Sequence, residues 1–138
     1  MQIRQIAPDE LEVVQALLVA GGWEQRAADL TRFSELVARS QVALVAIVDD
    51  SVVGFVRCLT DGISNGYISM LEVDPRFQRR GIGSALVRAC MGDNQDMTWV
   101  LRAGRPGLVS FYEKLGFTVS TVALERPRRQ GAHGSSPG

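Results

Sequence analysis

The sequence predicts one α/β domain with a central mixed sheet, and three observations support this prediction. Short apolar runs typical of strands alternate along the chain with stretches whose apolar residues recur at helical spacing. Two of the runs, 42–48 and 52–59, are joined by a turn-type segment, which predicts an antiparallel hairpin. The chain has 138 residues, a length that suits a single domain able to bury roughly two-thirds of its unfolded surface.

The first half of the chain contains this hairpin and the segments that precede it. Pro8, with Asp9 and Glu10 after it, is typical of the start of a helix, and Gly21-Gly22 is typical of its end. The elements expected here are a strand at 2–6, a helix between Pro8 and Gly21, a helix at 25–39, and strands at 42–48 and 52–59.

The second half continues the alternation. A turn-rich loop at 61–66 precedes a strand at 67–73, and the apolar stripe at 82, 85, 86, 89 and 90 predicts a core-facing helix after Gly81. A strand at 97–102, a short helix at 108–115 ended by Gly116, and a last strand at 117–124 complete the expected domain. From Arg126 the composition turns polar and rich in Gly and Pro, so we expect a domain over residues 1–125 and a flexible tail over 126–138.

Two glycines stand at the start of the third expected helix, in the run Gln78-Arg79-Arg80-Gly81-Ile82-Gly83-Ser84-Ala85. Because glycine has no Cβ, Gly81 and Gly83 let the backbone turn tightly and approach a ligand. The unpaired N–H groups of a helix's first turn and its positive dipole end favour an anion such as a pyrophosphate. An ordinary glycine-containing loop is the alternative. The run has neither the Gly-Lys-Ser/Thr of a P-loop nor the Gly-x-Gly-x-x-Gly of a dinucleotide fold.

The segment Val73-Asp74-Pro75-Arg76-Phe77-Gln78-Arg79-Arg80-Gly81-Ile82-Gly83 resembles the acetyl-CoA motif of the GCN5-related N-acetyltransferase (GNAT) family, Gln/Arg-x-x-Gly-x-Gly/Ala. A second segment, Phe111-Tyr112-Glu113-Lys114-Leu115-Gly116-Phe117, is similar to that family's C-terminal motif, in the family's order and at about its separation. The resemblance implies a GNAT-like fold, with a mostly antiparallel twisted sheet flanked by helices. It also implies transfer of an acetyl group from acetyl-CoA, as cosubstrate, to a primary amine by direct attack through a tetrahedral intermediate.

The resemblance assigns the cofactor contacts. The backbone N–H groups from about Arg79 to Ser84 would hold the pyrophosphate, Leu71 and Val73 would pair with the pantetheine arm, and the Val73 N–H would polarise the thioester carbonyl. Side chains of Arg79 and Arg80 would meet the 3′-phosphate or stay unpaired. The cofactor-binding residues expected are Leu71, Val73, Gln78, Arg79, Arg80, Gly81, Ile82, Gly83, Ser84 and Arg105.

Two side chains are expected to carry the chemistry. Tyr112 occupies the family's usual position for the acid that protonates the leaving thiolate, although its spacing alone also fits an aromatic core position. Glu72 would take the amine's proton directly or through water, or would be a salt-bridged structural carboxylate. In many family members water chains or the amine's own equilibrium suffice as base.

One departure concerns the segment before Tyr112. Arg105 occupies the place where the family often has an asparagine that contacts the cofactor arm, and Ser110 replaces the usual alanine, so this edge of the cofactor site is in doubt. Arg102 and Arg105 also bring two cations near the cleft.

The acceptor expected from a loose likeness to the small-amine branch is a small-molecule primary amine. The alternatives are an aminosugar, a protein N-terminus or lysine, a non-catalytic acyl-CoA sensor and a pure interaction module. Trp23 would be an aromatic wall for the substrate or a packing residue.

Composition limits the partners. The 15 basic and 15 acidic residues balance, so we expect no nucleic-acid or membrane partner, while a homodimer stays open. The longest apolar run, 42–48, is too short to cross a bilayer and the N-terminus lacks a signal-peptide pattern, which predicts a cytoplasmic protein.

The positions of the cysteines and the histidine argue against a metal site and against common hydrolase mechanisms. Cys58 and Cys90 lie among apolar residues, so buried free thiols are expected rather than a disulfide or a metal site, and no metal is expected elsewhere. His133, the only histidine, falls in the expected tail, which disfavours hydrolases that use a Ser-His or Cys-His pair. The arginines of that tail indicate a solvated terminus more than a nucleic-acid arm.

Overall fold

The computed structural model describes residues 1–129, apart from the side chains of Glu24 and Gln25. Five strands form one sheet in the order β1-β2-β3-β4-β5, which is also their order in the chain. The first three pairings are antiparallel and the last, between β4 and β5, is parallel. The strands are β1 (Gln2–Gln5), β2 (Val42–Val48), β3 (Ser51–Thr60), β4 (Asn65–Val73) and β5 (Thr98–Leu101). The predicted α/β fold with a mixed, mostly antiparallel sheet is therefore confirmed.

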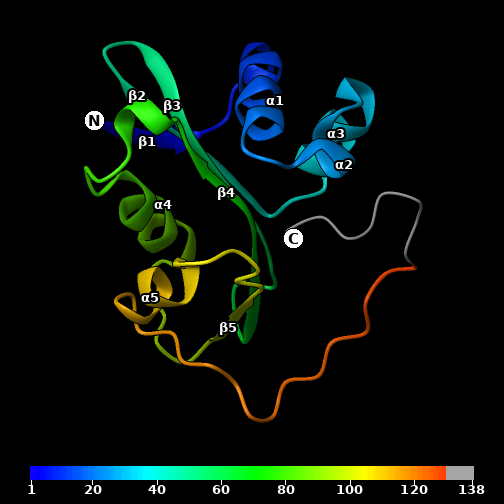
Figure 1. The fold of residues 1–138 in the computed structure, drawn as a ribbon, viewed down its shortest axis with the longest axis vertical. Helices are drawn as coiled ribbons and strands as arrows, with labels where there is room; N and C mark the ends of the chain where they lie inside the picture. The colour runs from blue at the N-terminus through cyan, green and yellow to red at the C-terminus, as the bar shows by residue number, and fades with distance from the viewer. Residues whose placement is uncertain (130–138) are drawn as a thin grey trace.

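Helices cover both faces of the sheet, as Figure 1 shows. One face packs against α1 (Leu11–Ala20), α2 (Glu24–Ala27) and α3 (Leu30–Ala38), around a core that includes Leu18, Phe33 and Phe55. The other face packs against α4 (Ile82–Met91) and α5 (Leu108–Glu113), around a second core that includes Val56 and Leu86. Single 3₁₀ turns, η1 (Pro8–Glu10) and η2 (Pro75–Phe77), precede α1 and follow β4. Among the described helices none combines the length and apolar character needed to cross a membrane.

The single helix predicted over residues 25–39 is wrong in its extent, because the chain breaks there into α2 and α3. Asp29 has an extended backbone and its side chain accepts a hydrogen bond from the Arg32 N–H at 3.1 Å. This is an N-cap, which starts a new helix and ends the earlier one. The turn predicted between β2 and β3 is confirmed: Asp49 and Asp50 both have left-handed backbones, with φ of 49° and 62°, as two-residue hairpin turns require.

The strand predicted over residues 117–124 is absent from the structure. After α5 the chain leaves the body of the domain as an extended trace (Figure 1). Val119, Val122 and Leu124 are exposed, Leu124 completely. The alternation of apolar residues predicts a strand. In the structure the Ser120 hydroxyl instead accepts hydrogen bonds from the Val122 and Ala123 N–H groups, which forms a local turn and no strand pairing.

The flexible tail predicted for residues 126–138 stays a prediction. Residues 126–129 are exposed and have no regular secondary structure. His133 and the remainder of the expected tail lie outside the described residues.

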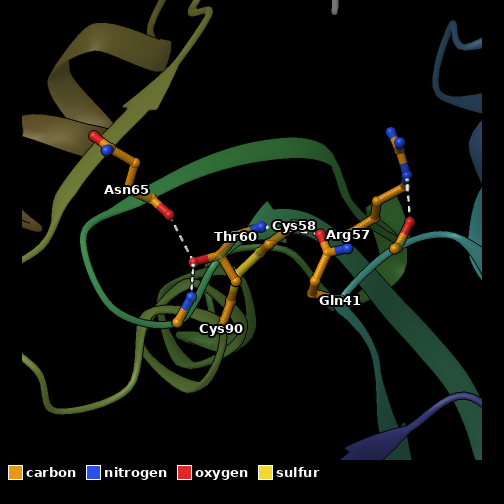
Figure 2. Close-up of a disulfide and its surroundings, with 8 residues drawn as sticks. Gln41, Arg57, Cys58, Thr60, Asn65 and Cys90 are labelled. Atoms are coloured by element: carbon orange, nitrogen blue, oxygen red, sulfur yellow. Dashed lines mark hydrogen bonds between the residues drawn. A yellow bond between two sulfur atoms is a disulfide. The ribbon is translucent and has the colours of Figure 1, made fainter.

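The prediction of free cysteines is wrong, because Cys58 on β3 and Cys90 on α4 form a disulfide in the structure (Figure 2). Both side chains belong to the core between the sheet and α4, and their Cα atoms are 6.8 Å apart, within the span that a disulfide bridges. Apolar neighbours in the sequence indicate burial for each cysteine separately. They carry no information on whether the two meet across the core.

Candidate active site

The site begins where β4 separates from β5. The parallel pairing ends at Ile68 and Leu101, so the remainder of β4 has no strand beside it on that side. The register against β3 also slips in this region, since Phe55 faces Glu72 whereas Arg57 faces Ser69, which leaves one extra residue in β4. Such a bulge bends a strand and redirects its side chains. Met70, within the bulge, has a left-handed backbone with φ of 60°.

The backbone orientation of β4 exposes the groups that the pantetheine arm would need. The Asp74 N–H donates to the Val53 carbonyl of β3 at 2.8 Å. Backbone polar groups of successive strand residues point to alternate sides, so Val73 and Leu71 direct theirs away from β3, toward the opening. This orientation agrees with the roles that the family resemblance implies for Leu71 and Val73.

The start of α4 lies beside this opening. Gly81 is the N-cap residue with φ of +79°, and a Cβ added there would meet no atom of residues 1–129 within 4 Å. Gly83 faces the Phe111 ring, which a Cβ would approach to 3.3 Å, so glycine here allows α4 and α5 to pack closely. Gln78 fastens the preceding loop by donating from Nε2 to the Val73 carbonyl at 3.2 Å.

A cavity of about 770 Å³ joins these parts, a size typical of ligand sites. Of the twelve residues predicted for the site, the cavity is lined by all except Arg80: Leu71, Glu72, Val73, Gln78, Arg79, Gly81, Ile82, Gly83, Ser84, Arg105 and Tyr112. The Arg80 guanidinium instead lies over the Phe77 ring, with its carbon 5.1 Å from the ring centroid. The sequence motif thus identifies one continuous surface.

Tyr112 reaches the cavity from α5. Its ring is only 7% exposed and packs edge-on against Phe111 and Phe117, with centroids 4.9 and 5.5 Å away. Burial raises the pKa of the Tyr112 phenol to about 12, against a smaller opposing effect of the Arg105 charge. The group therefore stays protonated at neutral pH, which a proton donor requires. The aromatic-core and catalytic interpretations of Tyr112 are compatible in this geometry.

Glu72 lies at the centre of a small polar cluster. Its Oε1 accepts a hydrogen bond from the Trp23 indole N–H at 3.0 Å and is 3.4 Å from the Arg105 Nη2. The Arg105 guanidinium also lies 5.8 Å from the centroid of the Trp23 ring. Gly21 leaves room for the carboxylate, because a Cβ at that position would overlap it. The cluster connects α1 and α2 to β4 and to the loop before α5.

Opposing effects act on the Glu72 carboxyl. Burial is the largest and raises its pKa, while the Trp23 N–H, the Arg105 charge and the Val73 N–H lower it. The net direction of the pKa shift is upward, because burial outweighs the opposing effects. Glu72 is thus salt-bridged to Arg105 and has a raised pKa in the same arrangement.

The structure adds cavity residues that sequence reasoning did not assign to the site. Tyr67 and Ser69 of β4 and Lys114 at the end of α5 line the cavity. The bulge at Met70 separates Ser69 and Tyr67 from Leu71 and breaks the strand alternation, so the sequence pattern alone does not place them in the site. No local signal links Trp23 to Glu72, which lies 49 residues further along the chain.

Comparisons with known proteins agree with the motifs. Residues 39–119, more than half of the chain, match the acetyltransferase (GNAT) domain family. The uncharacterized N-acetyltransferase YafP of Escherichia coli (strain K12) is 30% identical over 148 residues, covering 96% of this chain and 89% of that protein. The structure of the GNAT family acetyltransferase SP0256 from Streptococcus pneumoniae TIGR4 gives a TM-score of 0.73 at 28% identity, covering 93% of this chain and 97% of that one.

A third likeness concerns the fold alone. The PaiA N-acetyltransferase of Thermoplasma acidophilum, solved in complex with coenzyme A, gives a TM-score of 0.68 at 18% identity, covering 88% of this chain and 92% of that one. The match over residues 39–119 and the relation to YafP show that the chain belongs to the GNAT family of acetyl-CoA-dependent N-acetyltransferases.

Proposed function

We propose that this enzyme acetylates a small-molecule primary amine by direct attack on acetyl-CoA, with Tyr112 as the acid and Glu72 as the base. The observation that supports this most is the single cavity that holds the helix start at Gly81, the β4 backbone at Val73, and both side chains. A carrier, an amine and two proton-transfer groups are the components that acyl transfer from a thioester needs.

The residues present suit the diphosphate of the cosubstrate. Gly81 has a left-handed backbone, and no atom of the described residues lies within 4 Å of where its Cβ would be. The first-turn N–H groups of α4 and the helix dipole favour an anion there. Arg79 lines the same part of the cavity and adds a positive charge.

The reaction follows from the placement of the other groups. Glu72 accepts a proton as the amine approaches, and the neutral amine attacks the thioester carbonyl. The Val73 N–H stabilises the developing oxyanion, a contribution of about 3 kcal/mol for one fixed donor. Tyr112 then donates its proton to the thiolate as the C–S bond breaks, because burial keeps the phenol protonated until that moment. The nitrogen of the intermediate loses its extra proton in the same collapse, and this proton restores the Tyr112 phenol.

Gly81→Glu is expected to abolish coenzyme A binding, because it places a carboxylate where the diphosphate would sit. Gly92→Glu is the matched control, since Gly92 also has a left-handed backbone with open space around it but ends α4 at the far side from the cavity. Calorimetric titration with coenzyme A measures the affinity of both variants. Equal affinity in the two variants would show that the anion site does not lie at the start of α4.

Tyr112→Phe is expected to lower kcat by roughly 10²-fold or more while coenzyme A affinity changes little, because it removes a proton donor and keeps the ring. The substituted ring retains its packing against Phe111 and Phe117, so the fold is preserved. Thiol release gives kcat and calorimetry gives the affinity. An unchanged kcat would leave Tyr112 with a packing role only.

Glu72→Gln is expected to lower kcat/KM and to remove the step in its pH profile that Glu72 controls. A carboxylate accepts protons only when ionised, so kcat/KM falls as the pH drops through its pKa, and burial moves that step above the ordinary glutamate range. The Gln variant should keep only the dependence set by the amine. Glu35→Gln, on the exposed side of α3, is the control. A profile of unaltered shape in E72Q would make Glu72 structural.

An amine panel with acetyl-CoA and thiol detection tests the acceptor class. Small alkyl and aryl amines, an aminosugar such as glucosamine, and a short peptide with a free N-terminus are compared by kcat/KM. Highest kcat/KM for the small amines supports the proposal. Preference for the peptide or sugar overturns the acceptor assignment, and coenzyme A binding without thiol release for any amine would indicate a sensor.

A further inference from the structure

At the end of the cavity away from α4, the lining consists of Tyr67 and Ser69 of β4 with Arg102, which directly follows β5. Arg26 and Arg57 do not line the cavity but lie close enough for their charges to act on Tyr67. The register places Arg57 of β3 opposite Ser69, and residues opposite one another in neighbouring strands share a face of the sheet. Arg26 of α2 lies close enough for its charge to act on Arg57. We call Arg26, Arg57 and Arg102 the arginine cluster.

Arg57 is the most unusual member of the cluster. Only 8% of the residue is exposed, and its Nε donates to the Ser40 hydroxyl at 2.7 Å. Figure 2 shows its side chain leaving β3 away from the neighbouring Cys58. Among residues 1–129 no described carboxylate forms an ion pair with it. A buried guanidinium is rarely left without a paired anion.

The members of the cluster act on one another electrostatically. Burial lowers the pKa of Arg57, and the charge of Arg26 lowers it further. Burial also lowers the pKa of Arg26, with added effects of Arg128 and Arg102. The Tyr67 phenol lies within the field of all three cluster arginines. Of these, Arg102 is paired with Glu125 at 2.6 Å. An anion bound beside Arg57 would offset the effect of the Arg26 charge on this buried guanidinium.

The separation along β4 sets the length of the ligand. Ser69 precedes Glu72 by three residues, which is about 10 Å of strand, and Tyr67 precedes it by five, about 16 Å. The cation nearest to Glu72, Arg105, is already engaged by that carboxylate. A negative group on the ligand is therefore best accommodated far from the reacting amine.

We propose that the acceptor is an elongated amine carrying an anionic group, a carboxylate or a phosphate, that binds Arg57 beside Tyr67 and takes the place of Glu125 at Arg102, while its amine reaches Glu72. This assignment rests on the proposed acetyl transfer at Glu72 and Tyr112. It makes the arginine cluster a specificity-determining subsite roughly 10 Å or more from the reacting nitrogen.

Matched acceptors of two lengths test the assignment. The long amino acid 8-aminooctanoate should be acetylated with a kcat/KM tenfold or more above that for octylamine, as expected for a charge-assisted contact to arginine. The short pair, 4-aminobutyrate and butylamine, should show no such preference because the carboxylate does not reach the cluster. Comparison of kcat/KM for 8-aminooctylphosphonate and 8-aminooctanoate decides whether the subsite prefers a phosphate-like group or a carboxylate. Equal kcat/KM for the long pair, or the same preference in the short pair, would overturn the assignment.

Variants separate this subsite from the chemistry. Tyr67→Phe and Arg57→Gln should reduce the preference for 8-aminooctanoate over octylamine toward unity while octylamine turnover persists. Arg57→Lys keeps a positive charge in place of the buried guanidinium and should retain part of the preference. This variant provides the test if Arg57→Gln does not fold. Arg88→Gln, on the exposed side of α4, is the control and should change nothing. An undiminished preference in both R57Q and R57K would overturn the role of Arg57.

A binding measurement keeps this proposal distinct from the transfer reaction. With coenzyme A present, 8-aminooctanoate should raise the melting temperature of the wild-type enzyme and octylamine should not. The shift should be lost in Y67F and R57Q and kept in R88Q. If no amine releases thiol but this pattern holds, the proposed function fails and the anion subsite stands. If thiol is released without the pattern, only the subsite fails.

Discussion

The separation of β4 from β5 beyond Ile68 and Leu101 is the constraint on which the site depends. While two strands stay paired, their facing backbone N–H and C=O groups bond to each other and are not available to a ligand. Once the pairing ends, the groups of Leu71 and Val73 are directed into an opening, and the bulge at Met70 bends the strand beside it. The same gap lets the cavity extend along β4 from Val73 to Tyr67.

In the proposed function and its anion subsite, the two ends of the cavity hold negative charge by different means. At the α4 end, the backbone N–H groups after Gly81 would bind a diphosphate, aided by the helix dipole, with no buried side-chain charge required. At the other end, the positive charge would come from Arg102, which lines the cavity, and from the buried Arg57 near it. Between the two ends lie Glu72 and Tyr112, whose pKa values burial moves in the same upward direction. In the proposed mechanism the raised pKa makes Glu72 a stronger base, and Tyr112 keeps its proton until the thiolate leaves.

Sequence reasoning recovers the parts of this arrangement that are encoded locally. The helix start at Gly81 and the hairpin turn at Asp49-Asp50 each depend on a few adjacent residues, and both are found where expected. Features decided by contacts between distant segments are not recovered. The pairing of Cys58 with Cys90 and the bond from Trp23 to Glu72 join residues that share no pattern. The segment 117–124 has the alternation of a strand, but a strand also needs a partner edge, which a pattern within one segment does not supply.

The central claim is that the diphosphate of coenzyme A docks against the main-chain amides around the start of α4, with the pantetheine arm along β4. Amide chemical-shift changes measured by NMR during titration of the isotope-labelled enzyme with coenzyme A test it most directly, because each backbone N–H reports separately. The account predicts the largest chemical-shift changes at residues 79–84, smaller changes at Leu71 and Val73, and none at the distant turn at Asp49. Saturable changes that leave residues 79–84 unmoved would contradict it.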